Sequence, residues 1–213
     1  RAADLKEQAA GPPLNPVEMG HKSFDDICAV LAEDKEFTKT FSEVYPDGFS
    51  QSNITEAIAE FEKTLLTPSR FDQYLRGDKS ALTAEEQEGY ALFKANKCAT
   101  CHVGMNIGGQ SYDYMGIKNS YFDYRGTGLT DGDNGRYAVT KQESDLHKFK
   151  TPTLRNVMIT YPYMHDGSIN NIEDAVRIMH EFQIGTTISD TDMAKIVAFL
   201  GSLTGEYNGK TLQ

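Results

Sequence analysis

The sequence predicts an all-α protein in which short helices are separated by long irregular loops. Apolar residues recur at helical spacing in several segments, and most of these segments begin at a side chain that caps helices well. No alternation of apolar and polar residues continues for more than a few positions, so no extended sheet is expected. No stretch approaches the ~18 to 20 apolar residues that a membrane-spanning helix needs. The chain is therefore expected to contain no transmembrane segment.

The first helices follow from capping residues and proline positions. Residues 1–22 are expected to be a loop with short helical ends, because Gly11-Pro12-Pro13 and Asn15-Pro16 impose turn or extended geometry. Ser23 is expected to cap a helix whose apolar face includes Phe24, Cys28 and Leu31. Ser52 or Asn53 is expected to start the next helix, which Thr67-Pro68 would end.

Four further segments complete the expected fold. Thr83-Ala84-Glu85-Glu86 has the pattern of a capping box and predicts a helix over residues 84–96. Residues 103–150 lack regular periodicity, and their glycines suit an irregular loop that wraps around another group. Asn170 or Asn171 is expected to cap a helix with an inward stripe, and a last helix is expected to stop at Gly205. The stripe comprises Ile172, Ala175, Val176, Met179 and Phe182.

Charge and cysteine content exclude several functions. Lysine and arginine number 21 against 31 aspartate and glutamate residues, for a net charge of −10. Nucleic acid binding is not expected, because it requires clustered basic residues, whereas a basic protein partner would be attracted. The three cysteines do not form a disulfide framework, and Cys28 is expected to be a small buried hydrophobe.

The chemistry-bearing motif is Cys98-Ala99-Thr100-Cys101-His102, which has the C-x-x-C-H pattern of covalent c-type haem attachment. Two thiols one turn apart can each add to a vinyl group of the porphyrin, and the adjacent imidazole can then reach the iron. A thioredoxin-like redox pair would need a βαβ context, and a zinc site would need a second ligand pair at matching spacing. Neither is evident, so haem is favoured and the helices are expected to form a cytochrome c-like fold.

The identity of the sixth iron ligand decides what the haem can do, since methionine raises the potential for electron transfer. Met179 is the favoured candidate, because it lies on the inward face of a capped helix 77 residues after His102. His165 is expected to support the site without binding the iron. A calcium loop at residues 131–142 is rejected, because Arg136 and Gln142 stand at positions that require glycine and glutamate. The other methionines considered are Met105, Met115, Met158, Met164 and Met193.

Several short segments, in order along the chain, resemble the bacterial di-haem cytochrome c peroxidases. The N-terminal residues 1–19 resemble the stretch of that family beside its peroxidatic haem, and residues 67–78 are similar to its interdomain connection. Three later stretches of this chain are similar to the electron-transfer domain of that family. These are Pro152-Thr153-Leu154-Arg155-Asn156-Val157, Thr160-Tyr161-Pro162-Tyr163 with His165-Asp166-Gly167, and Ala175-Val176-Arg177-Ile178-Met179.

The resemblance implies a periplasmic two-haem enzyme that reduces hydrogen peroxide to water with electrons from a small cytochrome c or cupredoxin. Cys98, Cys101, His102 and Met179 would hold the high-potential electron-transfer haem. Gln8 and Glu18 would belong to the second, peroxidatic pocket, with Glu18 in the acid–base role. A calcium ion held by backbone oxygens of Thr160 and Pro162 is also implied, and a homodimer is expected.

The chain departs from the family in having one C-x-x-C-H motif where the family has two. It begins at Arg1 without an initiator methionine, so we expect either a processed protein or a piece of a longer one. The expected domains are residues 1–67, the remainder of the first haem domain, residues 68–205, the electron-transfer domain, and a tail over 206–213.

Two alternative functions remain open. The first is a single-haem electron carrier without catalysis. The second is a related di-haem enzyme that oxidises a protein residue, whose members have tyrosine where this chain has Met179.

Overall fold

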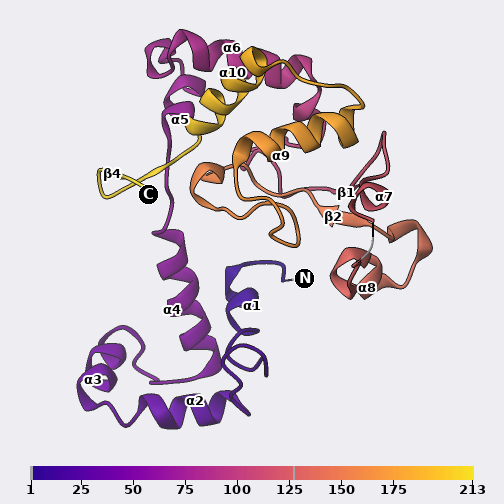
Figure 1. The fold of residues 1–213 in the computed structure, drawn as a ribbon. Coiled ribbons are helices and arrows are strands. Elements are labelled where there is room, and N and C mark those ends of the chain that lie inside the picture. Colours follow the sequence, from indigo (N-terminus) through magenta and orange to yellow (C-terminus); the bar gives the residue numbers. More distant parts are fainter. Residues whose placement is uncertain (1, 127) are drawn as a thin grey trace. The chain divides into compact units, whose positions relative to one another are not determined.

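The computed structural model describes residues 2–126 and 128–213, and the chain divides into two compact units. The first unit is Arg1–Leu66 and the second is Thr67–Gln213 (Figure 1). Helices form most of the regular structure in both units, so the predicted all-α fold class is confirmed. Among the described residues, no helix is both long enough and apolar enough to cross a membrane.

The described residues of the first unit form helices α1 (Leu5–Ala9), α2 (Phe24–Leu31), α3 (Lys35–Val44) and α4 (Gln51–Lys63). Each begins at a side chain that accepts a hydrogen bond from a backbone amide of the first turn. This bond satisfies an amide that has no carbonyl partner within the helix. These caps are Asp4, Ser23, Asp34 and Ser50. The small core of the unit consists of Phe24, Ile27, Phe41 and Ile54.

The predicted helix starting at Ser23 is confirmed, whereas the predicted start of α4 at Ser52 or Asn53 is wrong. Ser50 is the cap, and its hydroxyl accepts from the amide of Asn53 at 3.1 Å. The side chain of Asn53 instead donates to the carbonyl of Gly48 at 2.8 Å. Helix α4 also ends at Lys63, before the proline expected to stop it.

The second unit contains helices α5 (Arg70–Leu75), α6 (Ala84–Ala95), α7 (Tyr121–Arg125), α8 (Tyr137–Thr140), α9 (Ile172–Ile178) and α10 (Asp190–Gly201). A π-helix over Met179–Ile184 continues α9 directly. Short 3-10 turns cover Lys79–Ala81, Cys98–Thr100, Asp131–Asn134, Glu143–Asp145 and Val157–Ile159. The predicted capping box of α6 and the Asn171 cap of α9 are both present.

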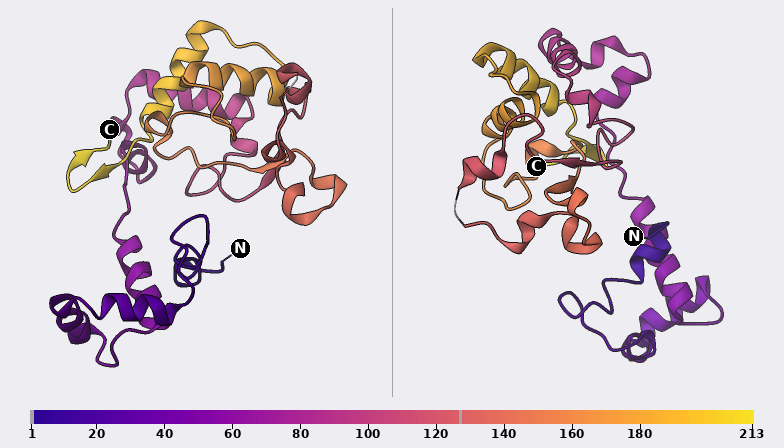
Figure 2. Two further views of the ribbon diagram at one scale, coloured as in Figure 1. Left: turned by 60° about the horizontal axis from the view of Figure 1, so that its bottom comes forward. Right: turned by 90° about the vertical axis from the view of Figure 1, so that its right-hand side faces the viewer.

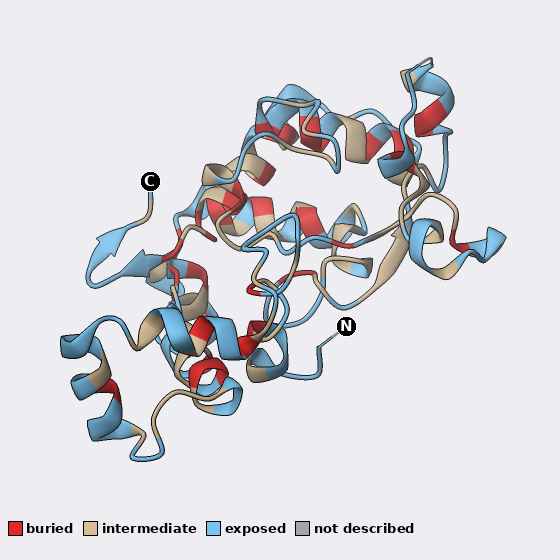
Figure 3. Ribbon diagram, turned by 90° about the horizontal axis from the view of Figure 1, so that it is seen from below, coloured by how far each residue is buried: buried red, intermediate tan, exposed pale blue. Residues whose placement is uncertain are grey.

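Helices α6 and α10 lie side by side and build the core of the second unit (Figures 1 and 2). Their close approach depends on Gly89, where an added Cβ would lie 1.9 Å from the carbonyl oxygen of Lys195. Phe199 and Leu203 are fully buried beside Phe93 in this core. The helices carry buried residues on one side and exposed residues on the other, as amphipathic helices do (Figure 3).

Two small antiparallel sheets lie in the described part of the second unit. Strand β1 (Tyr112–Tyr114) pairs with β2 (Lys148–Lys150), so that Asp113 lies opposite Phe149. Strand β3 (Glu206–Tyr207) pairs with β4 (Lys210–Thr211) in a hairpin at the end of the chain. The first sheet thus ties together the two ends of the long irregular segment that the sequence predicts.

The predicted end of the last helix at Gly205 is wrong, because α10 ends at Gly201. Gly205 is required for a different reason: a Cβ there would lie 2.2 Å from the carbonyl oxygen of Thr67. The backbone amide of Phe71 donates to Ser202, and that of Glu206 donates to Pro68. The first and last segments of the second unit therefore lie against each other.

Candidate haem site

The C-x-x-C-H motif follows α6 directly. Lys97 adopts a left-handed conformation (φ 64°), which ends the helix and starts the 3-10 turn Cys98–Thr100. The amides of Cys101 and His102 donate to the carbonyl of Cys98 at 3.3 and 3.0 Å. All three cysteines are free, and Cys98 and Cys101 are half-buried. The turn therefore carries two thiols and an imidazole on one compact stretch of backbone.

The imidazole of His102 is oriented by a backbone carbonyl. Its Nδ1 lies 3.2 Å from the carbonyl oxygen of Pro152. Because a carbonyl can only accept, Nδ1 must carry the proton, and Nε2 is left with a lone pair for a metal. Burial lowers the pKa of His102, which favours this neutral form. The arrangement suits an axial ligand to haem iron.

The two thiols do not resemble a reactive redox pair. Burial raises the pKa of Cys98 to about 11 and also raises the pKa of Cys101. Catalytic dithiols have lowered pKa values, since the thiolate is the reactive form. Within the described residues, no group of three or more His, Cys, Asp or Glu side chains is arranged to hold a metal ion. The raised pKa values disfavour the thioredoxin-like alternative.

The segment that supplies the Pro152 carbonyl is held in place by the residues that follow it. Thr153 donates to the carbonyl of Asn106 at 2.6 Å. Arg155 forms a bidentate pair with Asp72, with both bonds at 2.7 Å, and also donates to the carbonyl of Met105. These bonds connect the segment to α5 and to the loop that follows His102, so they position the acceptor for the imidazole.

A carboxylate lies beside the second cysteine. Asp113, on β1, accepts hydrogen bonds from Ser111 at 2.6 Å and from Thr151 at 2.7 Å. Burial and the neighbouring negative charge of Asp113 both raise the pKa of the Cys101 thiol. Sequence reasoning missed Asp113, because a single acidic residue in an irregular segment carries no recognisable signal.

Met179 lies at the junction between α9 and the π-helix and is half-buried. It is not part of the packed apolar clusters of the described residues, whereas Met193 is buried in the main core and Met158 and Met164 pack against it. Met105 is 83% exposed. A π-helical turn often occurs at a functional site, because it displaces a side chain from regular helical register. These features distinguish Met179 from a core-filling methionine.

His165 belongs to a charged cluster. Its Nε2 lies 2.8 Å from the carboxylate of Asp133, which is 2% exposed. Arg125 pairs with Asp133 and also with Asp166 at 3.0 Å. The ring of His165 lies 4.3 Å, between centroids, from that of Phe149 on β2. The cluster holds the 165–166 loop against α7 and the first sheet.

The remaining predicted site residues lie in exposed segments. Gln8 lies in α1. Glu18 lies in a series of turns, and its backbone amide donates to the carbonyl of Asn15 at 3.0 Å. Both are exposed and belong to the first unit. Thr160 and Pro162 are exposed in the second unit, and within the described residues their carbonyl oxygens accept no hydrogen bond.

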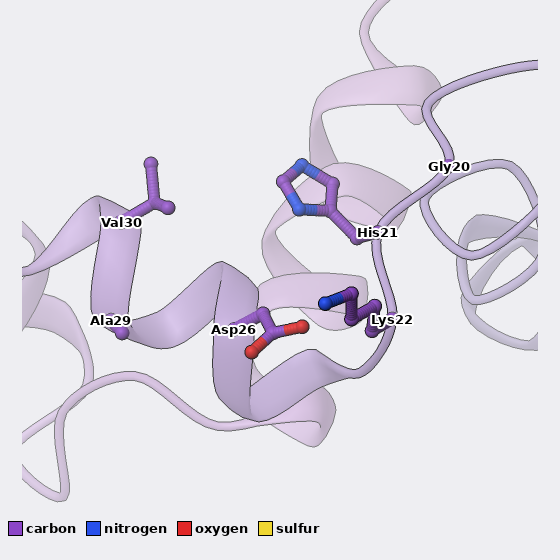
Figure 4. A pocket seen from close by; sticks show the side chains of 6 residues that line it. All are labelled: Gly20, His21, Lys22, Asp26, Ala29 and Val30. Carbon is purple, nitrogen blue, oxygen red and sulfur yellow. The ribbon is translucent and has the colours of Figure 1, made fainter.

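An open hollow in the first unit is separate from the motif. Figure 4 shows the imidazole of His21 and the side chains of Lys22 and Asp26 around it. Its lining residues are Gly20, His21, Lys22, Asp26, Ala29 and Val30.

Residues 86–204 match the cytochrome c family. The second unit, with its thiol pair and oriented imidazole, is thus a c-type cytochrome domain. Residues 1–80 match the di-haem cytochrome c peroxidase family. Cytochrome c peroxidase Ccp of Escherichia coli (strain K12) is 52% identical over 208 residues, which cover 97% of this chain and 44% of that protein.

Two further relatives agree with this assignment. Cytochrome c551 peroxidase of Nitrosomonas europaea is 45% identical over 210 residues, covering 97% of this chain and 60% of that protein. The crystal structure of a MauG-like protein associated with microbial copper homeostasis superposes with a TM-score of 0.82 at 25% identity, covering 95% of this chain and 69% of that one. The chain belongs to the di-haem cytochrome c peroxidase family, which confirms the resemblance. It spans 44% to 60% of the length of these two curated relatives.

Proposed function

We propose that this chain is the electron-transfer part of a periplasmic cytochrome c peroxidase, which reduces hydrogen peroxide to water. The observation that carries the proposal is the hydrogen bond between His102 Nδ1 and the Pro152 carbonyl, directly after a C-x-x-C turn. It leaves Nε2 available as an iron ligand in a domain of the cytochrome c family.

Each residue of the site has a separate task. Cys98 and Cys101 attach the haem through thioether bonds, and the haem when bound supplies a one-electron redox centre. His102 would bind the iron through Nε2, held in a single tautomer by Pro152. Met179 would supply the second protein ligand, and its soft thioether would favour the reduced iron and a high potential. His165 supports the site through Asp133 and does not bind the iron.

The peroxidatic chemistry belongs to the first domain of the whole protein. We assign residues 1–67 to that domain, residues 68–205 to the electron-transfer domain and residues 206–213 to a tail. Glu18 would move a proton between the two oxygens of peroxide, and Gln8 would orient the substrate. Their exposure within the first unit leaves both side chains free for such a role.

Calcium is proposed at the backbone oxygens of Thr160 and Pro162. Calcium prefers oxygen ligands, including backbone carbonyls, and takes six to eight of them. Both carbonyls are free of hydrogen bonds from the described residues, and the remaining ligands would come from elsewhere. The electron donor is expected to be a small cytochrome c or cupredoxin, attracted by the net charge of −10, and the whole protein is expected to be a homodimer.

The proposal is tested by mass spectrometry and iron analysis of protein made in a periplasm that attaches haem. We expect one covalent haem on the peptide that contains Cys98 and Cys101, and its loss in the Cys98→Ala, Cys101→Ala double variant. Free thiols that react with alkylating agents in the untreated protein would contradict the proposal.

A single-haem electron carrier remains the alternative, which the single C-x-x-C-H motif would favour if the whole protein carries no second one. Iron content per polypeptide and peroxide turnover, measured on the whole protein, separate the two functions. Two irons and turnover support the peroxidase. One iron with reversible reduction and no turnover supports the carrier.

A further inference from the structure

The carboxylate of Asp113 is fixed beside the haem attachment turn by partners that do not depend on haem. Ser111 donates to it at 2.6 Å and Thr151 at 2.7 Å, and Thr151 is only 6% exposed. The pairing of β1 with β2 sets the position of Asp113 opposite Phe149. The carboxylate is therefore held by two hydroxyls and by a sheet.

The same segment also orients the imidazole. Thr151, which binds Asp113, is followed by Pro152, whose carbonyl accepts from His102. The amide of Thr151 donates to the carbonyl of Ser111 at 2.9 Å, and its carbonyl accepts from Gly109 at 2.7 Å. The segment Thr151-Pro152 thus positions both the carboxylate of Asp113 and the imidazole of His102.

The hydroxyls of Ser111 and Thr151 hold the pKa of Asp113 below its usual range, so the carboxylate is ionised at neutral pH. Thioether formation removes the hydrogen of the Cys101 thiol but leaves the two hydroxyl donors intact. A fixed negative charge beside a haem edge stabilises the oxidised iron, which carries one more positive charge than the reduced iron.

We propose that Asp113 is a residue that sets the reduction potential of the haem, by placing a fixed negative charge beside Cys101 and His102. Asp113 does not bind the iron and acts only through its charge. The inference rests on the proposed attachment of haem at Cys98 and Cys101. The charge of Asp113 would lower the reduction potential of the haem below the value that the methionine ligand alone would set.

The test is a potentiometric titration, followed in the visible spectrum, of the haem-loaded protein and four variants. Asp113→Asn and Asp113→Ser both remove the charge, and we expect both to raise the potential. At a fixed solution potential, the ratio of reduced to oxidised haem should rise at least about threefold, which corresponds to about 28 mV for a one-electron couple. Asp113→Glu keeps the charge and should titrate near the unmodified protein.

The matched control is Glu85→Gln, which removes one exposed negative charge from the first turn of α6. The length of α6 separates it from the motif by about 15 Å, so its effect should be much smaller. Equal potentials for both neutral variants and the unmodified protein would overturn the inference, as would a shift in Asp113→Glu as large as that in Asp113→Asn. Absence of covalent haem in the unmodified protein would instead refute the proposed function.

Discussion

Replacing Arg155 by methionine tests how the second unit holds the Pro152 segment. The guanidinium makes two bonds of 2.7 Å to Asp72, and its side chain and that of Asp72 are 16% and 21% exposed. It also donates to the Met105 carbonyl at 3.1 and 3.0 Å. Breaking a buried ion pair costs about 3 to 5 kcal/mol. Because this pair is partly exposed, we expect Arg155→Met to lower the free energy of unfolding by about 2 to 4 kcal/mol.

The measurement is urea denaturation followed by circular dichroism, with Asp72→Asn and the double variant to complete a double-mutant cycle. The cycle should give a coupling energy of about 1 to 3 kcal/mol between the two residues. The matched control is Arg177→Met, because Arg177 pairs with Asp190 through side chains that are 45% and 87% exposed. Surface pairs contribute about 0 to 1 kcal/mol. A loss in Arg155→Met no larger than in this control would refute the reasoning.

The pH dependence gives an independent check on the same pair. Burial raises the pKa of Asp72, but the hydrogen bonds from Arg155 and from the Ser69 amide outweigh it and hold the pKa below its usual range. A carboxyl whose pKa is lower in the folded state than in the unfolded chain stabilises the fold above about pH 4. This contribution is lost as the pH falls through the folded value. In Arg155→Met, we expect the acid-induced loss of stability to be smaller.

Three further substitutions test other parts of the molecule. Met179→His should lower the reduction potential of the haem and abolish the methionine–iron charge-transfer band, and an unchanged titration would exclude Met179 as a ligand. Thr83→Ala removes half of the capping box of α6 and should cost about 1 kcal/mol in urea unfolding, whereas Thr83→Ser should be nearly neutral. Phe199→Ala empties a fully buried position and should cost about 3 to 5 kcal/mol, and a loss below 1 kcal/mol would contradict the packing of the core.

The features that were predictable from the sequence are local in origin. The caps Ser23, Thr83 and Asn171 mark helix starts, because each side chain bonds to an amide within its own first turn. The C-x-x-C-H motif is equally local, since its five residues are consecutive. Helix α3 was missed although Asp34 caps it, because its short amphipathic pattern contains many charged residues.

The support of the site could not be predicted, because it depends on contacts between residues far apart in the chain. The acceptor of the His102 proton is a backbone carbonyl 50 positions away, and a carbonyl carries no sequence signature. Asp113 is likewise held by Thr151, 38 positions away. The sequence could therefore identify the groups that react with the cofactor but not the groups that orient them.

The contact between the two ends of the second unit has a consequence for protein engineering. The chain enters the cytochrome domain at Pro68 and leaves it at Glu206, and the amide of Glu206 donates to the carbonyl of Pro68 at 2.9 Å. A short linker could join these positions, and new termini could be opened in an exposed loop. The domain is therefore a suitable candidate for circular permutation or for insertion as a redox module into a host protein.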